Sequence, residues 1–179
     1  RRVLLGMGAL AVVGLTGCTE TVPVVASCNP VAIDDGHECA VCGMYVAHHP
    51  GPKGQVCLRG GRGVLMFCST RDMFAWLLQP ESRSQVEAVF VHDMGATGWA
   101  QPVDSALVDA YQAWYVIDHP LMGSMGPTLA PFARREAAEA FAAEHGGTLL
   151  AYHDVTLQTL AQMERGGHSH APRHGHGGH

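Results

Sequence analysis

Long hydrophobic runs are missing from most of this sequence: after Cys18, no stretch is apolar for long enough to cross a bilayer. Basic residues are also scarce, since 11 Lys and Arg stand against 16 Asp and Glu, for a formal net charge of −5. No basic run is present that could follow a phosphate backbone. We therefore expect no nucleic acid among the partners of this protein.

The first residues have the features of an export signal. Arg1 and Arg2 precede the uncharged stretch VLLGMGALAVVGL, which is too short for a membrane-spanning helix. LTGC, residues 15–18, resembles a bacterial lipobox, in which cleavage leaves a lipid-modified cysteine as the first residue. We predict a signal peptide over residues 1–17 and a stable lipid anchor on Cys18. The mature chain would be periplasmic and tethered to a membrane, with the outer membrane favoured; an ordinary signal peptide with an incidental cysteine is the alternative.

The rest of the chain divides into four segments by composition. Residues 18–36 contain two prolines and no helical period, so we expect an extended stalk. Residues 37–98 and 99–165 form the folded part, and residues 166–179 are rich in glycine and histidine. This tail should be disordered and could collect divalent metal ions through its five histidines, which are His168, His170, His174, His176 and His179.

Each half of the folded part is expected to run from strand to helix to strand. The elements expected in the first half are strands over 54–61 and 64–69, a helix over 71–79 and a strand over 86–93. Ser69 or Thr70 should cap that helix and Pro80 should end it. The elements expected in the second half are a strand over 109–118, a helix over 132–147 and a strand over 148–155. We predict the α+β class, with two small lobes that meet near residues 98–102.

Six cysteines in an exported chain first suggest disulfides. With Cys18 assigned to lipid, five remain, so at least one sulfur is free or bound to something other than a cysteine of this chain. Cys57 and Cys68 each fall inside an expected strand, where a buried cysteine serves as a small apolar side chain. The redox states of these two cysteines and of Cys28 stay open.

Cys39 and Cys42 form a close pair within ECAVCGMYVAHHP, residues 38–50. Such a pair could act in thiol–disulfide exchange, but the second cysteine of that motif normally lies in a helix, and Gly43 and strand-forming residues follow Cys42 here. Structural zinc sites typically use two close pairs, which this chain lacks. A redox protein and a zinc lobe are therefore the alternatives to a site for a softer metal.

Met44 supplies a soft ligand two residues after Cys42, on the same side of the chain if this segment is extended. Thiolate and thioether sulfur both suit Cu(I), whereas thioether binds zinc, magnesium and calcium poorly. Met122 and Met125 lie in a loop of Gly, Ser and Pro that offers little for them to pack against. These methionines indicate a Cu(I) site drawn from both lobes, with core packing as the alternative.

The chain closely resembles the NosL family, the lipoprotein copper chaperones that accompany nitrous-oxide reductase, in four stretches: ECAVCGMYVAHHPGPKGQV, FCSTRDMFAWLLQPE, VHDMGATGW and SMGPTLAPFARREAAEAFAAEHGG. The likeness spans roughly residues 37–163. It implies two ββαβ-type lobes that bind one Cu(I), and a binding protein rather than an enzyme. It also implies that the copper is used in maturing the reductase's copper centres, with a membrane transporter complex and its periplasmic subunit as partners.

By position, the resemblance implies that Cys42, Met44 and Met125 are the Cu(I) ligands. Cys39 and Met122 are lower-ranked candidates, because Cys39 need not be a ligand and Met122 does not fall on the position of the family's second-lobe methionine. The histidines of the tail are outside the shared pattern.

Overall fold

The computed structural model describes the backbone of residues 28–169 and the side chains of residues 28–165. The expected signal peptide and Cys18 lie outside the described residues, as do residues 170–179 of the tail. None of the described helices combines the length and the hydrophobicity that a membrane span requires.

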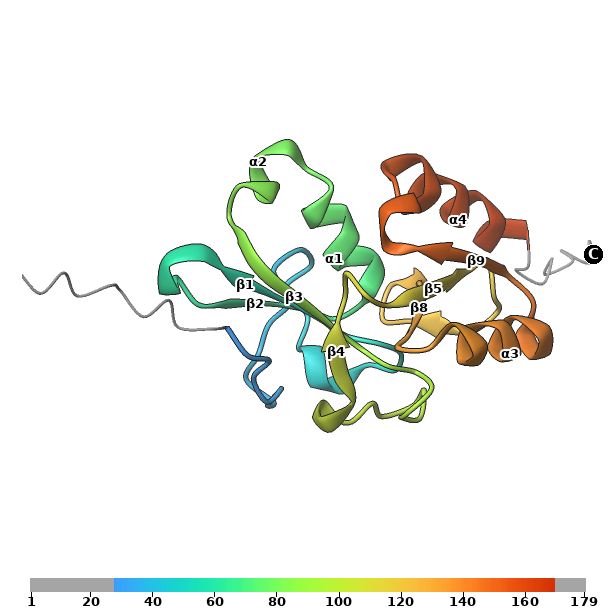
Figure 1. The fold of residues 1–179 in the computed structure, drawn as a ribbon, viewed down its shortest axis with the longest axis horizontal. Helices are drawn as coiled ribbons and strands as arrows, with labels where there is room; N and C mark the ends of the chain where they lie inside the picture. The colour runs from blue at the N-terminus through green and yellow to red at the C-terminus, as the bar shows by residue number, and fades with distance from the viewer. Residues whose placement is uncertain (1–27, 170–179) are drawn as a thin grey trace, which may run out of the picture.

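The first lobe is built on a four-stranded antiparallel sheet with the strand order β2-β1-β3-β4 (Figure 1). Its elements are β1 (Gly54–Leu58), β2 (Val64–Phe67), α1 (Thr70–Leu77), α2 (Pro80–Arg83), β3 (Val86–His92) and β4 (Leu107–Asp109). Strand β1 has a partner on each side, and its first four residues are buried. The hairpin expected from the glycine-rich segment between β1 and β2 is present.

Helix α1 begins where the sequence predicts. Ser69 is the N-cap, and its hydroxyl accepts a hydrogen bond from the backbone N–H of Asp72 at 3.1 Å. Thr70 is the first helical residue, and its hydroxyl donates to the carbonyl of Leu129 in the second lobe at 2.6 Å. The start of α1 is therefore held by its own cap and by the second lobe together.

The second lobe repeats the connectivity of the first. Its main elements are β5 (Trp114–Ile117), β8 (Ala130–Phe132), α3 (Arg135–His145) and β9 (Thr148–Ala151). Its sheet has the order β8-β5-β9, which corresponds to β2-β1-β3, so the first strand of each lobe lies between the second and the third. Gly146 ends α3 with a φ of 80°, as the paired glycines predicted. The expected α+β class with two ββαβ-type lobes is confirmed.

The single strand expected over residues 109–118 is two strands in the structure. Asp109 ends β4, which pairs with β3 in the first sheet, and β5 begins only at Trp114. The Asp109 carboxylate accepts a hydrogen bond from the backbone N–H of Tyr111 at 2.8 Å, and this contact turns the chain. The first sheet thus takes its fourth strand from the segment that follows residues 98–102.

Residues 28–36 contain no helix or strand, as expected of a stalk, but they are attached to the first lobe. Cys28 forms a disulfide with Cys57 of β1. The Gln55 amide accepts from the N–H of Val31 at 2.9 Å and donates to the carbonyl of the same residue at 2.6 Å. Cys57 is buried, as expected of a cysteine in this strand, and its redox state, which the sequence left open, is that of a disulfide with a partner 29 positions earlier, where no local pattern indicates it.

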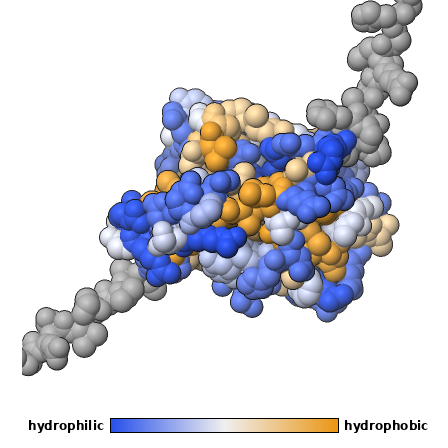
Figure 2. All heavy atoms as spheres, turned by 90° about the horizontal axis from the view of Figure 1, so that it is seen from above, coloured by the Kyte–Doolittle hydropathy of each residue, from blue (hydrophilic) through white to orange (hydrophobic). Residues whose placement is uncertain are grey.

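One hydrophobic core runs through both lobes. It combines the first sheet and α1 with residues of the second lobe, including Tyr115, Leu129 and Met163. The alternate residue of β5, Val116, faces the other side of the second sheet and packs in a smaller cluster with Phe132 under α3. On the face drawn in Figure 2, hydrophobic side chains gather in a band between hydrophilic ones. The two lobes therefore share the main core, and the second lobe has a smaller cluster of its own on the other face of its sheet.

Helix α4 (Leu157–Ser169) was not expected from the sequence. It contacts α1 of the first lobe, and its buried residues Leu160 and Met163 belong to the shared core. Its last turn takes up residues 166–169, which were expected to belong to the tail.

Candidate metal centre

Three thiols and one carboxylate meet in the first lobe. Cys39 and Cys42 belong to the loop that precedes β1, Cys68 directly follows β2, and Asp72 lies in the first turn of α1. One ligand atom from each of the four residues lies within 4.8 Å of the others. Cys42 is half-buried, and the other three are buried.

The loop that carries Cys39 and Cys42 is closed by backbone hydrogen bonds. The N–H of Cys39 donates to the carbonyl of Met44 at 2.9 Å, and the N–H of Gly43 donates to the carbonyl of Cys39 at 2.9 Å. Gly43 has a φ of 71°, which glycine adopts without steric cost. The expectation of an extended segment from Cys42 to Met44 is therefore wrong, because these residues lie in a tight turn.

The thiol of Cys68 is the centre of the cluster. Its sulfur lies 3.3 Å from the sulfur of Cys42 and 3.3 Å from one oxygen of the Asp72 carboxylate. The Cys39 sulfur lies 3.9 Å from the same carboxylate oxygen. Cys68 is brought here because the backbone of Ala40 donates to the carbonyl of Met66 in β2 at 2.8 Å, which joins the cysteine loop to this strand.

The second lobe reaches the cluster through a short hairpin, β6 (Met122–Gly123) and β7 (Gly126–Pro127). Ser124, at the tip, donates from its hydroxyl to the Cys68 sulfur at 2.9 Å. Met125 follows at the tip and is 53% exposed, and Met122 is 41% exposed. The indole N–H of Trp99 donates to the carbonyl of Met122 at 2.9 Å and helps to fix the hairpin.

The predicted ligands thus have different surroundings. Cys42 and the lower-ranked Cys39 lie in the cluster. Met44 lies on the same loop and packs half-buried against the core, and Met125 follows Ser124 at the exposed tip of the hairpin. Of the tail histidines, only His168 falls within the described backbone, and no side chain of the tail is described.

The electrostatics of the cluster favour one thiolate among the three sulfurs. A hydrogen bond from the Cys68 thiol lowers the pKa of Cys39 to about 4, against the opposing effect of burial. The same bond, together with burial, raises the pKa of Cys68, and burial raises the pKa of Cys42. Burial also raises the pKa of Asp72.

Two cations lie close to these groups. Lys53 is 3% exposed, and its ammonium donates to the backbone carbonyls of His49, Pro50 and Cys68 at 2.5, 3.0 and 3.3 Å. Burial lowers the pKa of Lys53 to about 8. Arg71 lies 3.7 Å from the Asp72 carboxylate and forms an ion pair with Glu164 of α4. Nearby positive charge of this kind stabilises thiolates and the anionic complexes that they form with metals.

The matching positions of the second lobe carry no thiol. There the backbone of Met94 donates to the carbonyl of Pro131, as that of Ala40 donates to Met66 in the first lobe. In this alignment Cys68 corresponds to Ala133, and Asp72 corresponds to Ala137. The repeated fold therefore offers these ligands in one lobe only.

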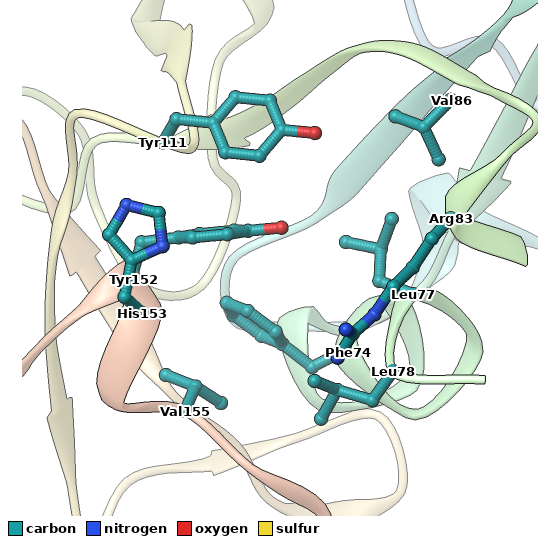
Figure 3. Close-up of a pocket in the computed structure, with 9 residues that line it drawn as sticks. All are labelled: Phe74, Leu77, Leu78, Arg83, Val86, Tyr111, Tyr152, His153 and Val155. Carbon is teal, nitrogen blue, oxygen red and sulfur yellow. The ribbon is translucent and has the colours of Figure 1, made fainter. Parts of the chain in front are cut away.

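A separate cavity of about 410 Å³ opens between the lobes (Figure 3). Its lining residues are Phe74, Leu77, Leu78, Arg83, Val86, Tyr111, Tyr152, His153 and Val155. None of these is a cysteine, a methionine or a carboxylate. The cavity is therefore not the metal centre, although α1 contributes to both.

Sequence reasoning missed Cys68, Asp72 and Ser124 as members of this site. The odd number of cysteines was the available signal for Cys68, because it required a sulfur with another role. Asp72 lies in the first turn of α1, where a carboxylate is favourable in any helix, so its type and position did not indicate a place among the thiols. Nothing local to Ser124 indicates its contact with a residue 56 positions away.

Comparisons with known proteins agree with the resemblance. A family model described as NosL matches residues 30–160. A copper-binding lipoprotein NosL from Stutzerimonas stutzeri is 45% identical over 183 residues, which cover 98% of this chain and 95% of the relative. A second protein of that description, from Achromobacter cycloclastes, is 37% identical over 172 residues and covers 92% and 86%.

A solved structure shares the fold. The crystal structure of the copper chaperone NosL from Shewanella denitrificans matches with a TM-score of 0.71 and 42% identity, over 73% of this chain and 97% of that one. The family model, the nearly full-length relatives and the shared fold agree: this chain belongs to the NosL family.

Proposed function

We propose that this protein is a lipid-anchored periplasmic chaperone that binds Cu(I) and passes it on for the maturation of the copper centres of nitrous-oxide reductase. The observation that carries the proposal is the group of three thiols from Cys39, Cys42 and Cys68. The names of the relatives, copper-binding lipoproteins, support the metal and the anchor. They describe binding proteins and not enzymes, and no chemical conversion is assigned to this chain.

Copper is proposed as Cu(I) because the available donors are soft. Cys42 and Met44 supply a thiolate and a thioether from one turn, and Met125 supplies a second thioether from the hairpin of the other lobe. Cys39 and Cys68 are further thiol donors within 4.8 Å of Cys42. The contact between Ser124 and Cys68 supports a contribution from Met125, because it holds the backbone beside Met125 at the cluster.

The exposure of the donor side chains provides a route for releasing copper to a partner. Cys42 is half-buried and Met125 is 53% exposed, so a partner's sulfur or imidazole can reach the metal before the chaperone's own ligands leave. Such stepwise exchange lowers the barrier to transfer without requiring weak binding. We assign the membrane transporter complex and its periplasmic subunit as the partners in this transfer. The lipid on Cys18 would keep the chaperone at the membrane, the outer membrane by preference.

Zinc binding is the second candidate, because the Asp72 carboxylate completes a set of four donors that suits Zn²⁺. Zn²⁺ and Cu(I) differ in whether their binding should depend on thioether ligands. Zinc should bind without Met44 and Met125, whereas Cu(I) binding should depend on them.

The deciding experiment is a titration of the reduced protein with Cu(I) in competition with a chromophoric Cu(I) chelator, repeated with Zn²⁺ and a zinc indicator. We expect one tight Cu(I) per chain, weakened by Cys42→Ser and by Met44→Leu. The matched control is Met94→Leu, at the position of the second lobe that corresponds to Ala40. Tight zinc binding that is indifferent to Met44→Leu, without tight Cu(I) binding, would replace the proposal with the zinc alternative.

A further inference from the structure

The sulfurs of Cys42 and Cys68 lie 3.3 Å apart, although the two residues are 26 positions apart in the chain. Cys42 comes from the loop before β1, and Cys68 comes from the end of β2. The chain already contains one disulfide, Cys28–Cys57, as is common in an oxidising compartment. Two further thiols in contact are therefore placed to become a second disulfide.

We propose that Cys42 and Cys68 are a reversible disulfide-forming pair, which a disulfide oxidant converts to a form unable to take up metal and a dithiol reductant restores. This inference rests on the proposed function, since the pair belongs to the same site. It differs from a CxxC reaction between Cys39 and Cys42, because the partner of Cys42 comes from another strand.

Thiol–disulfide exchange provides the reaction. Cys42 is the point of attack because it is half-buried, whereas Cys39 and Cys68 are 4% and 0% exposed. The Cys42 thiol loses its proton and its sulfur attacks one sulfur of the oxidant's disulfide; the oxidant's other sulfur takes up a proton and leaves as a thiol. The Cys68 sulfur then attacks the Cys42 sulfur and releases the second thiol. The pair loses two electrons and two protons, and both appear in the two thiols of the reduced oxidant.

The oxidised pair cannot serve as a metal site. Two of the three cysteine sulfurs would be bonded to each other, which leaves the buried Cys39 as the one thiol of the cluster. Bound metal should in turn prevent disulfide formation, because a metal bound to Cys42 and Cys68 occupies the sulfur lone pairs that the exchange requires. Metal loading and disulfide formation are therefore mutually exclusive, and a dithiol reductant is needed before copper can enter an oxidised chaperone.

The test uses the full chain after mild reduction. We expect the Cys28–Cys57 disulfide to survive this treatment, because Cys57 is fully buried. The protein is treated with oxidised glutathione, with or without one equivalent of Cu(I), and its disulfides are mapped by mass spectrometry. We expect a Cys42–Cys68 cross-linked peptide, at least tenfold less Cu(I) bound, and recovery with dithiothreitol. Bound Cu(I) should slow the cross-link at least tenfold.

Matched variants separate this pair from the alternatives. Cys39→Ser should keep the Cys42–Cys68 cross-link, and Cys68→Ser should lose it while Cys28–Cys57 stays intact in both. A cross-link that joins Cys39 to either partner in the unmutated chain, or oxidised protein that still binds Cu(I) fully, would overturn the inference. Reduced protein that forms the cross-link but never binds Cu(I) would instead refute the proposed function, and the two failures are thereby distinguished.

Discussion

The hydroxyl oxygen of Ser124 lies 2.9 Å from the sulfur of Cys68 and 3.1 Å from the carbonyl oxygen of Cys68, and its one proton is shared between these two acceptors. The two residues belong to different lobes and lie 56 positions apart. Met125 follows Ser124, so this contact fixes the backbone next to a methionine of the second lobe beside a thiol of the first. The junction between the lobes is therefore part of the candidate metal centre as well as of the core.

Replacing Met125 by leucine should weaken Cu(I) binding about tenfold, or about 1.4 kcal/mol, while the protein stays folded. The side chain is 53% exposed, and leucine keeps most of its volume, so the free energy of unfolding should change by less than about 1 kcal/mol. Competition with a chelator measures the affinity, and urea unfolding measures the stability. Met122→Leu is the matched control from the same hairpin and should have much less effect.

X-ray absorption provides an independent measurement of the same prediction. Loss of the Met125 thioether should reduce the number of sulfur atoms around copper. An unchanged copper environment and an unchanged affinity would mean that the first lobe binds the metal alone.

Cys42→Ser should lower the Cu(I) affinity by about 100-fold or more, and Cys39→Ser should lower it much less. Cys42 shares a turn with Met44 and is the thiol that solvent reaches, whereas Cys39 is buried beside Asp72. Parallel chelator titrations of the two variants measure the difference. Equal losses would indicate that both thiols bind the metal, and the assignment of Met44 would then be abandoned.

The regular elements of the fold could be predicted because local patterns encode them. Ser69 caps α1 through a hydrogen bond to a residue three positions later, and Gly146 ends α3 with a positive φ. The break at residues 110–113 escaped prediction because its segment is as apolar as a strand. The Asp109 carboxylate turns the chain there, and a fourth strand joins the first sheet.

The metal centre was only partly predictable for a related reason. Cys39, Cys42 and Met44 lie within six positions, so their motif is visible in the sequence. Cys68, Asp72 and Ser124 join them through the pairing of the loop with β2 and through the packing of the second lobe. The pairing of Cys28 with Cys57 likewise depends on the folded position of residues 28–36.

Removing the disulfide should destabilise the protein without abolishing metal binding. The bridge spans 29 positions, and closing a loop of that length restricts the unfolded chain by about 3.5 kcal/mol. The double variant Cys28→Ala, Cys57→Ala should therefore unfold at lower urea concentration by about that free energy. Its Cu(I) stoichiometry should remain one per chain, and a loss of Cu(I) from the folded variant would show that these cysteines contribute to the site.

Deleting residues 170–179 should lower the number of divalent ions bound and leave one tight Cu(I). Four of the five tail histidines lie in this segment. Imidazole is a good ligand for Cu²⁺, Ni²⁺ and Zn²⁺, whereas Cu(I) prefers the sulfur ligands of the metal centre. The deletion keeps all of the described α4. Equilibrium dialysis with Ni²⁺ and chelator competition with Cu(I) separate the two effects. A shortened protein that no longer binds Cu(I) would contradict this division.

Acid should destabilise the fold through two buried histidines. His92 and His119 are 1% and 6% exposed, and burial lowers the pKa of each to about 4. Asp104 partly opposes this effect at His92, and His145 adds to it at His119. Unfolding returns each pKa to about 6.5, so the unfolded chain binds more protons between pH 6.5 and pH 4. Stability is therefore complete above pH 6.5 and falls as the pH drops through this window.

At pH 5, each histidine should lower the free energy of unfolding by roughly 2 kcal/mol relative to pH 8. His119 is the better site for a test, because both of its ring nitrogens are buried and its ring contacts the rings of Trp99 and Phe141. His119→Phe should fill the same space and reduce the loss of stability between pH 8 and pH 5 by about this amount in urea unfolding. His153→Gln, at an exposed position, is measured alongside as the control for replacing a histidine. Equal pH dependence in His119→Phe and in the unmutated protein would show that this histidine is already charged in the folded state.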